Sequence, residues 1–222
     1  DFYQSALAFG NFQRLLADYP AETLHETIPN FHNTVKRFSD FKKAVEKDAC
    51  GRAADVQKEI QFVLEREQLT HTLVDLQEAG KLPLRVTHND TKLNNIMIDN
   101  ATHKGICVID LDTVMPGLSL NDFGDSIRFG ASTAAEDEQD ISKVFCDLHL
   151  FEVYVKGFLK GCGGALTDLE VEMLPMGAIL MTFECGMRFL ADHLEGDHYF
   201  RIHRENQNLD RARTQFKLVW DM

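Results

Sequence analysis

The chain has little of what disulfide-bonded, zinc-binding or nucleic-acid-binding proteins need. Its 222 residues include five cysteines, an odd number without a C-x-x-C pair, which argues against a disulfide framework or a zinc knuckle. Acidic residues outnumber Lys and Arg by 35 to 23 and the net charge is −12, so nucleic acid and anionic membranes are not expected partners. The nine histidines contain no H-E-x-x-H, and His198 and His203 have no carboxylate or cysteine at ligand spacing.

Long apolar runs are also absent. No uninterrupted stretch approaches the roughly 20 residues required to span a bilayer, and the opening DFYQ has neither the basic start nor the apolar body of a secretory signal. We therefore expect a cytoplasmic protein with reduced thiols and no membrane contact, and the sequence does not indicate its oligomeric state. Hydrophobic residues make up 44% of the chain, which is ample for a core.

Most of the chain shows the apolar spacing of amphipathic helices. Apolar residues spaced three and four apart predict helices over 2–16, 31–45, 56–76 (before Gly80), 141–159 and about 201–220. Thr167-Asp168-Leu169-Glu170 predicts a capping box that opens another helix, with a bend or break at Pro175. The acidic run at 136–140 is interpreted as a solvated helix start.

Between these helical regions the pattern changes to that of short strands. Leu84–Thr87, Ile96–Ile98 and Gly105–Ile109 are the predicted strands, and the turn at 99–104 would join the last two into a hairpin. The expected fold is therefore α+β and mostly α, with one domain over residues 1–222 and a small central β hairpin.

Two aspartates and an asparagine lie at the ends of these strands. Asp90 and Asn95 lie on the loop between the first two strands, and Asp110 follows the third. ATP-dependent phosphoryl transfer needs one carboxylate to accept a hydroxyl proton, and an amide and a second carboxylate to hold magnesium. Lys92 is placed to touch the transferred phosphoryl group. Because Asn and Asp are also ordinary turn residues, the joint spacing carries this prediction.

The same stretch resembles a known family. HNDTKLNN at 88–95 resembles the H-x-D-x-x-x-x-N catalytic loop of the protein-kinase-like superfamily, and VIDLD at 108–112 looks like the I-D-x-[DE] metal strand of the aminoglycoside phosphotransferase and choline kinase branch. The string IDLDTVMPGLSLNDFGDSIRFG at 109–130 is similar to bacterial N-acetylhexosamine 1-kinases. The resemblance implies a phosphotransferase that uses ATP and Mg²⁺ and phosphorylates the anomeric hydroxyl of GlcNAc or GalNAc.

The resemblance also assigns roles in the loop and the metal strand. It implies that Asp90 is the catalytic base, that Lys92 contacts the phosphoryl group, and that Asn95 and Asp110 hold magnesium. Asp112 is a candidate auxiliary metal contact.

Other positions receive supporting or substrate roles. The resemblance implies that His88 pins the loop, and that Asp122 opens a helix and binds backbone N–H groups of the loop, although Asp122-Phe123-Gly124 spells the DFG metal motif of protein kinases. Asn89 stands where the branch usually has glycine, and Asn tolerates left-handed backbone geometry. Arg188 and Tyr199 match sugar-contacting positions, while a buried ion pair with Glu184 is the alternative for Arg188.

Kinases of this kind also have an N-terminal lobe with a β-sheet, a glycine-rich loop and an ATP-gripping lysine. No G-x-G-x-x-G and no β-rich block comes before residue 84. We therefore expect the C-terminal helical lobe alone, with the catalytic loop and metal strand at 84–130, the ATP-gripping lobe absent and little turnover by this chain itself. The alternatives are a choline, homoserine or aminoglycoside kinase, or a non-catalytic binding module. Aminoglycoside kinases commonly have histidine at the position of Lys92, so an aminoglycoside substrate is less favoured. A choline site needs an aromatic cage for the quaternary ammonium group, which a chain with a single Trp does not favour.

Overall fold

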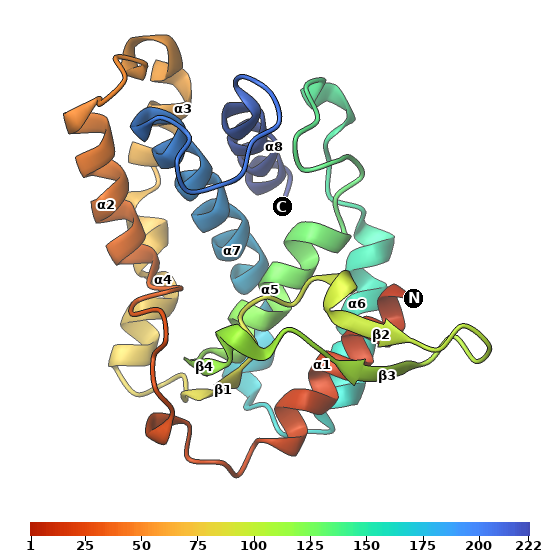
Figure 1. The fold of residues 1–222 in the computed structure, drawn as a ribbon. Helices are drawn as coiled ribbons and strands as arrows, with labels where there is room; N and C mark the ends of the chain where they lie inside the picture. The colour runs from red at the N-terminus through yellow and green to blue at the C-terminus, as the bar shows by residue number, and fades with distance from the viewer. The chain divides into compact units, whose positions relative to one another are not determined.

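The computed structural model describes all 222 residues (Figure 1). Its contacts divide the chain into two compact units, each assembled from three separate stretches. The first unit comprises Asp1–Phe31, Leu76–Ala131 and Asp147–Ala178, and the second comprises His32–Asp75, Ser132–Cys146 and Ile179–Met222. Helices predominate and the strands are short and antiparallel, which confirms the predicted α+β, mostly α class.

The first unit is built around two helices that pack at backbone distance. They are α1 (Phe2–Leu15) and α6 (Leu148–Cys162). Glycines make this approach possible, because a Cβ added at Gly10 would lie 2.3 Å from the Phe158 carbonyl oxygen, and one at Gly161 would lie 2.4 Å from the Leu7 carbonyl oxygen. The unit also holds α5 (Ser119–Gly130) and the first part of α7 (Asp168–Glu195).

Four strands form two small ladders in the first unit (Figure 1). β2 (Ile96–Ile98) pairs with β3 (Gly105–Val108), which confirms the predicted hairpin. Its turn is closed by Asp99, whose carboxylate accepts the backbone N–H of Thr102 at 2.7 Å. β1 (Arg85–Thr87) pairs with β4 (Met115–Gly117), a strand that the sequence analysis missed because Met-Pro-Gly has no strand pattern.

The second unit has its own apolar core. It contains α2 (Thr34–Lys47), α3 (Gln57–Leu64), α8 (Gln207–Asp221) and most of α4 (Glu67–Glu78) and α7. Fully or nearly fully buried side chains from these helices form one cluster that includes Phe38, Phe41, Val63, Phe183, Leu190 and Phe216.

Short 3₁₀ turns occur in both units. Those of the first unit are Ala21–Thr23, Leu93–Asn95 and Leu111–Thr113, and those of the second are Ala53–Val56 and Ile141–Lys143.

Several predicted boundaries were wrong. The helix predicted over 141–159 begins only at Leu148, because the carboxylate of Asp147 accepts the N–H groups of His149 and Leu150 and caps the helix there. The acidic run at 136–140 precedes a 3₁₀ turn and starts no α-helix. The helix predicted over 56–76 is divided between a 3₁₀ turn, α3 and α4, and the last helix begins at Gln207.

The long helix α7 opens as predicted. Thr167 and Glu170 form a capping box, in which the Thr167 N–H donates to Glu170 Oε2 at 2.8 Å and the Glu170 N–H donates to Thr167 Oγ1 at 3.2 Å. The helix continues through Pro175, so of the predicted bend or break the break does not occur. By length and a mean hydropathy of 1.2, α7 could cross a membrane, but 67% of that window is buried, as in the core helix of a globular protein.

Candidate functional site

The loop of residues 88–95 connects β1 to β2 and is anchored on α5 by a buried carboxylate. Asp122, in the first turn of α5, accepts the backbone N–H of His88 at 3.0 Å and that of Asn89 at 2.7 Å. The side chain of Gln13 donates to the same carboxylate at 2.6 Å. Burial raises the pKa of Asp122, and these donors oppose the effect. Asn89 has φ of 65°, the left-handed geometry that asparagine tolerates.

A second group of contacts fixes the next residue of the loop. The backbone N–H of Thr91 donates to Asp125 Oδ2 at 3.0 Å, and the Ser126 hydroxyl donates to the Thr91 carbonyl at 2.6 Å. Asp125 is also held by Arg128, whose Nε lies 3.0 Å from Oδ1. The sequence leaves Asp125 open as a supporting or surface residue, and the structure shows the supporting role: its place about one helical turn after Asp122 puts both on the face of α5 that meets the loop.

His88 joins the loop to the end of β3. Its ring is fully buried and lies edge-on to Phe9 and Phe12, with centroid distances of 5.3 and 6.0 Å. Nε2 lies 2.9 Å from the Ile109 carbonyl, and the Asp90 N–H points to Nδ1 at 3.3 Å. These partners assign the tautomer with hydrogen on Nε2. The ring therefore fixes Asp90 relative to the residue that precedes Asp110.

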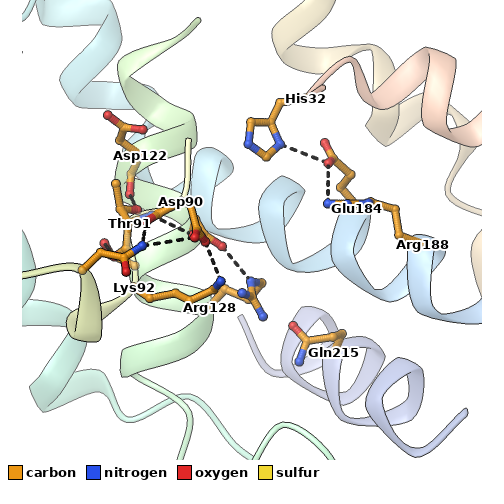
Figure 2. A network of polar contacts seen from close by, with 12 residues as sticks. His32, Asp90, Thr91, Lys92, Asp122, Arg128, Glu184, Arg188 and Gln215 are labelled. Atoms are coloured by element: carbon orange, nitrogen blue, oxygen red, sulfur yellow. Dashed lines mark hydrogen bonds and ion pairs between the residues drawn. The ribbon is translucent and has the colours of Figure 1, made fainter. Parts of the chain in front are cut away.

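The carboxylate of Asp90 lies between an ammonium group and an amide. Lys92 Nζ is 2.7 Å from Oδ1, and Figure 2 shows the two side chains facing each other. The amide nitrogen of Asn95 donates to Oδ2 at 3.1 Å and to the Asp90 carbonyl at 2.8 Å. The Asp90 side chain remains 25% exposed, so this carboxylate is oriented by the protein and still accessible to a ligand.

The hairpin brings Asn95 and Asp110 to the same end. Ile96 pairs with Val108, and the Ile109 N–H donates to the Asn95 carbonyl at 3.0 Å, so the pairing extends to the residues beside both side chains. Asp110 has φ of 62° and its exposed carboxylate makes no hydrogen bond or ion pair; the same holds for the carboxylate of Asp112 in the following 3₁₀ turn.

These oxygens suit a hard cation. The amide nitrogen of Asn95 is occupied by Asp90, which leaves its amide oxygen for another partner. An amide oxygen with one or two carboxylates is the kind of ligand set that Mg²⁺ takes beside substrate phosphates. No group of three or more His, Cys, Asp or Glu side chains is close enough to hold a metal by itself. A metal here would therefore need the amide of Asn95 and oxygens from its substrate.

The second unit brings together the other two predicted residues. Arg188 Nη2, on α7, lies 3.5 Å from the Tyr199 hydroxyl, and the guanidinium carbon lies 5.7 Å from the Tyr199 ring and 5.4 Å from the Phe200 ring. Together with Arg37 and Phe41 they line a cavity of about 170 Å³. We call the cavity around Arg188, Tyr199 and Phe200 the arginine–tyrosine pocket.

A buried carboxylate lies behind the arginine of this pocket. Glu184 Oε1 is 3.9 Å from Arg188 Nη1 and 3.0 Å from His32 Nδ1 (Figure 2). The ion pair with Glu184, the alternative role predicted for Arg188, is therefore present as a long contact. The same guanidinium also lines the pocket, so the two roles do not exclude each other. Sequence reasoning missed His32, because 152 residues separate it from Glu184 and no local pattern marks the pair.

Comparison with known families gives one match. A model of the phosphotransferase enzyme family matches residues 2–145, which is more than half of the chain. The matched segment contains the loop at 88–95, both strands of the hairpin and α5.

Proposed function

The chain belongs to the phosphotransferase enzyme family, and from this membership we propose that it acts as a kinase that transfers the γ-phosphoryl group of ATP to the anomeric hydroxyl of an N-acetylhexosamine. The observation that carries the proposal is the Asp90 carboxylate, oriented by Lys92 and Asn95 on a loop fixed by buried side chains. The acceptor class rests on the resemblance of residues 109–130 to N-acetylhexosamine 1-kinases and on the arginine–tyrosine pocket.

In this reaction Asp90 accepts the proton of the attacking hydroxyl. A general base must lie within hydrogen-bonding reach of that proton and must be held in one orientation. The amide of Asn95 on Oδ2 and the ammonium group of Lys92 on Oδ1 restrict the carboxylate from both sides. Lys92 is also the positive charge nearest to Asp90, so it is placed to stabilise negative charge on the phosphoryl group that the hydroxyl attacks.

Asn95 and Asp110, with Asp112, would hold magnesium through the oxygens described above. Magnesium neutralises charge on the nucleotide phosphates when it is bound. The β2–β3 register and the contact between His88 and Ile109 fix the backbone beside Asn95 and Asp110, and the exposed carboxylates of Asp110 and Asp112 stay free to take up a cation.

The arginine–tyrosine pocket supports a sugar acceptor. A guanidinium and a phenol supply hydrogen-bond donors for hydroxyl and acetamido oxygens, and the rings of Tyr199 and Phe200 supply an apolar surface for the C–H face of a sugar ring. We also propose that the chain serves as the C-terminal lobe of the kinase and that efficient ATP use requires a β-rich N-terminal lobe.

A panel assay of the complete gene product tests the proposal. GlcNAc, GalNAc, galactose, choline, homoserine and an aminoglycoside are incubated with Mg²⁺ and ATP, and ³¹P NMR identifies the phosphorylated position. Phosphate on C1 of GlcNAc or GalNAc is expected. Turnover of choline alone would overturn the sugar assignment, and no ATP-dependent product on any acceptor would overturn the kinase proposal.

The variant Asp90→Asn tests the base. Because asparagine cannot accept the hydroxyl proton, kcat is expected to fall by roughly 10²- to 10⁴-fold. Asp18→Asn is the matched control, since Asp18 is exposed, lies in the same unit and makes no side-chain contact. Full activity of Asp90→Asn would remove Asp90 from its assigned role.

A further inference from the structure

The loop that carries Tyr199 and Phe200 is wrapped around one buried carboxylate. Asp192, on α7, is 4% exposed. Its Oδ1 accepts the backbone N–H of His198 at 3.0 Å and that of Tyr199 at 2.8 Å, and its Oδ2 accepts the N–H of Phe200 at 3.0 Å. Three successive N–H groups directed at one anion form an anion-binding nest whose occupant is the protein's own side chain.

Further contacts hold the same loop at two positions with positive φ, a conformation that residues other than glycine rarely adopt. Gly196 and Asp197 have φ of 108° and 61°, and their N–H groups donate to the Asp192 carbonyl at 3.0 and 2.8 Å. The buried Asn208 donates to Asp192 Oδ2 and to Asp197 Oδ1, both at 2.9 Å. Arg52 Nη1 lies 2.6 Å from Asp197 Oδ2. The backbone of 196–200 is therefore fixed mainly from Asp192 and its neighbours.

The side chain of Tyr199 depends on this backbone for its position. The residue is 69% exposed, and the neighbours of its ring are the Phe200 ring at a centroid distance of 4.8 Å and the guanidinium of Arg188. A side chain with so little packing of its own takes its direction from its main chain. The 3.5 Å contact between the Tyr199 hydroxyl and Arg188 thus follows from where Asp192 holds the Tyr199 N–H.

We infer that Asp192 is the positioning residue of the arginine–tyrosine pocket: by binding the N–H groups of residues 198–200 it sets Tyr199 and Phe200 against Arg188 and so determines acceptor affinity. The inference rests on the proposed function, in which that pocket binds the acceptor. Asp192 touches no substrate and acts through Tyr199.

Steady-state kinetics of Asp192→Asn in the complete gene product test this inference. Asparagine keeps one acceptor oxygen and places an amide NH₂ against backbone N–H groups, so the loop loses its fixed geometry. With GlcNAc as the acceptor, its KM is expected to rise by at least about tenfold, while kcat and the KM for ATP change by less than about threefold, the pattern of lost ground-state binding. Glu172→Gln, an exposed carboxylate on the same helix, is the matched control and is expected to match wild type.

A double-mutant cycle separates positioning from general destabilisation. If Asp192 acts through Tyr199, Asp192→Asn adds little to the acceptor KM of Tyr199→Ala, because the two effects are coupled. Additive effects, or a fall in kcat with unchanged acceptor KM, would overturn the inference. Should Asp192→Asn not fold, Gly196→Ala disturbs the loop from the other side, since its Cβ would lie 3.0 Å from His198 Nε2 at a φ that alanine avoids.

A crystal structure of Asp192→Asn, or of Gly196→Ala in its place, supplies a readout that does not depend on activity. The Tyr199 hydroxyl is expected to lose its contact with Arg188 Nη2. An unchanged loop would contradict the inference even if the kinase proposal is correct. A wild-type protein that is inactive towards every acceptor of the panel would contradict the kinase proposal even if the loop moves in the variant. The two failures are therefore distinguishable.

Discussion

Four buried carboxylates accept backbone N–H groups and thereby fix a segment of the chain. Asp122 holds the N–H groups of 88 and 89, Asp125 holds that of Thr91, Asp192 holds those of 198–200, and Glu170 holds that of Thr167. A buried carboxylate is tolerated only where such donors replace water. At the scale of single residues, these acidic side chains therefore have a structural role, and substituting one of them should displace the backbone segment that it holds.

Glu170 also takes part in a buried ion pair. Arg85 Nε and Nη2 lie 2.6 and 2.7 Å from its two oxygens, and the Ser119 hydroxyl donates at 2.8 Å. Burial raises the pKa of Glu170, but the hydrogen bonds from Arg85, Thr167 and Ser119 outweigh it, so the pKa lies below its ordinary value of 4.5. The pKa of Arg85 is raised mainly by its hydrogen bond to Glu170.

The pH dependence of stability tests this pair. Because folding lowers the pKa of Glu170, the pair contributes stability above the ordinary value of 4.5 and loses it as the pH falls through the lowered pKa. Glu170→Gln leaves the Arg85 charge unpaired and is expected to lower the unfolding free energy by about 3 kcal/mol at neutral pH. Urea denaturation at a series of pH values should show the difference from wild type shrinking below pH 4.5. A difference that stays constant with pH would contradict the assignment.

At the scale of elements, the close packing of α1 on α6 depends on glycine. Gly161→Ala would place a Cβ 2.4 Å from the Leu7 carbonyl oxygen, and backbone cannot yield as a side chain can. Alanine favours an isolated helix by about 1 kcal/mol, but the clash should dominate and lower the unfolding free energy by about 1–3 kcal/mol.

Urea denaturation at neutral pH measures the effect of Gly161→Ala. Gly80→Ala is the comparison, since a Cβ there meets no atom within 4 Å and only the φ of +67° opposes it. Its cost is expected to be about 1 kcal/mol. A Gly161→Ala protein as stable as wild type would show that the two helices can separate without loss.

The sequence predicted the elements whose signals are local. Periodicity identified α1 and α2, and a capping box identified the start of α7. β4 was missed because it depends on pairing with β1 across the chain. The late start of α6 was missed although its cap at Asp147 is local, because apolar residues at helical spacing continue before the cap, at Ile141, Val144 and Phe145. Family membership is also confirmed, whereas the N-acetylhexosamine acceptor stays a prediction.

The candidate site divides in the same way. The motif at 88–95 and Asp110 could be read directly, because the loop and hairpin that hold them are continuous in sequence. Their roles stay predictions. Asp192 and His32 could not be predicted, because their partners are brought to them by loop geometry and by the tertiary fold, and for Asp125 the sequence offered only its spacing from Asp122.

At the scale of the whole molecule, the candidate residues divide between the two units. Asp90, Asn95 and Asp110 belong to the first unit, and Arg188 and Tyr199 belong to the second. The proposed roles predict that variants of the two units have different kinetic effects. Residues that act on the phosphoryl group should change kcat, and residues that hold the acceptor should change its KM.

Arg188→Ala tests this division in the complete gene product. Loss of a guanidinium hydrogen bond to the acceptor is expected to raise the KM for GlcNAc by about tenfold, with kcat and the KM for ATP nearly unchanged. Arg201→Ala is the matched control, because Arg201 is an exposed arginine of the same unit whose side chain makes no contact. A large fall in kcat with an unaltered acceptor KM would assign Arg188 to the phosphoryl-transfer step instead.

The α1–α6 pair also has a consequence for synthesis. α1 starts at Phe2, while its partner α6, which meets the backbone at Gly10, ends at Cys162. At roughly 5–20 residues per second, a ribosome needs on the order of ten seconds or more to deliver that partner after α1 has emerged. Throughout that interval the face of α1 that packs on α6 is uncovered, so the yield in a cell should depend on chaperones that shield α1 until translation has passed the last turn of α6.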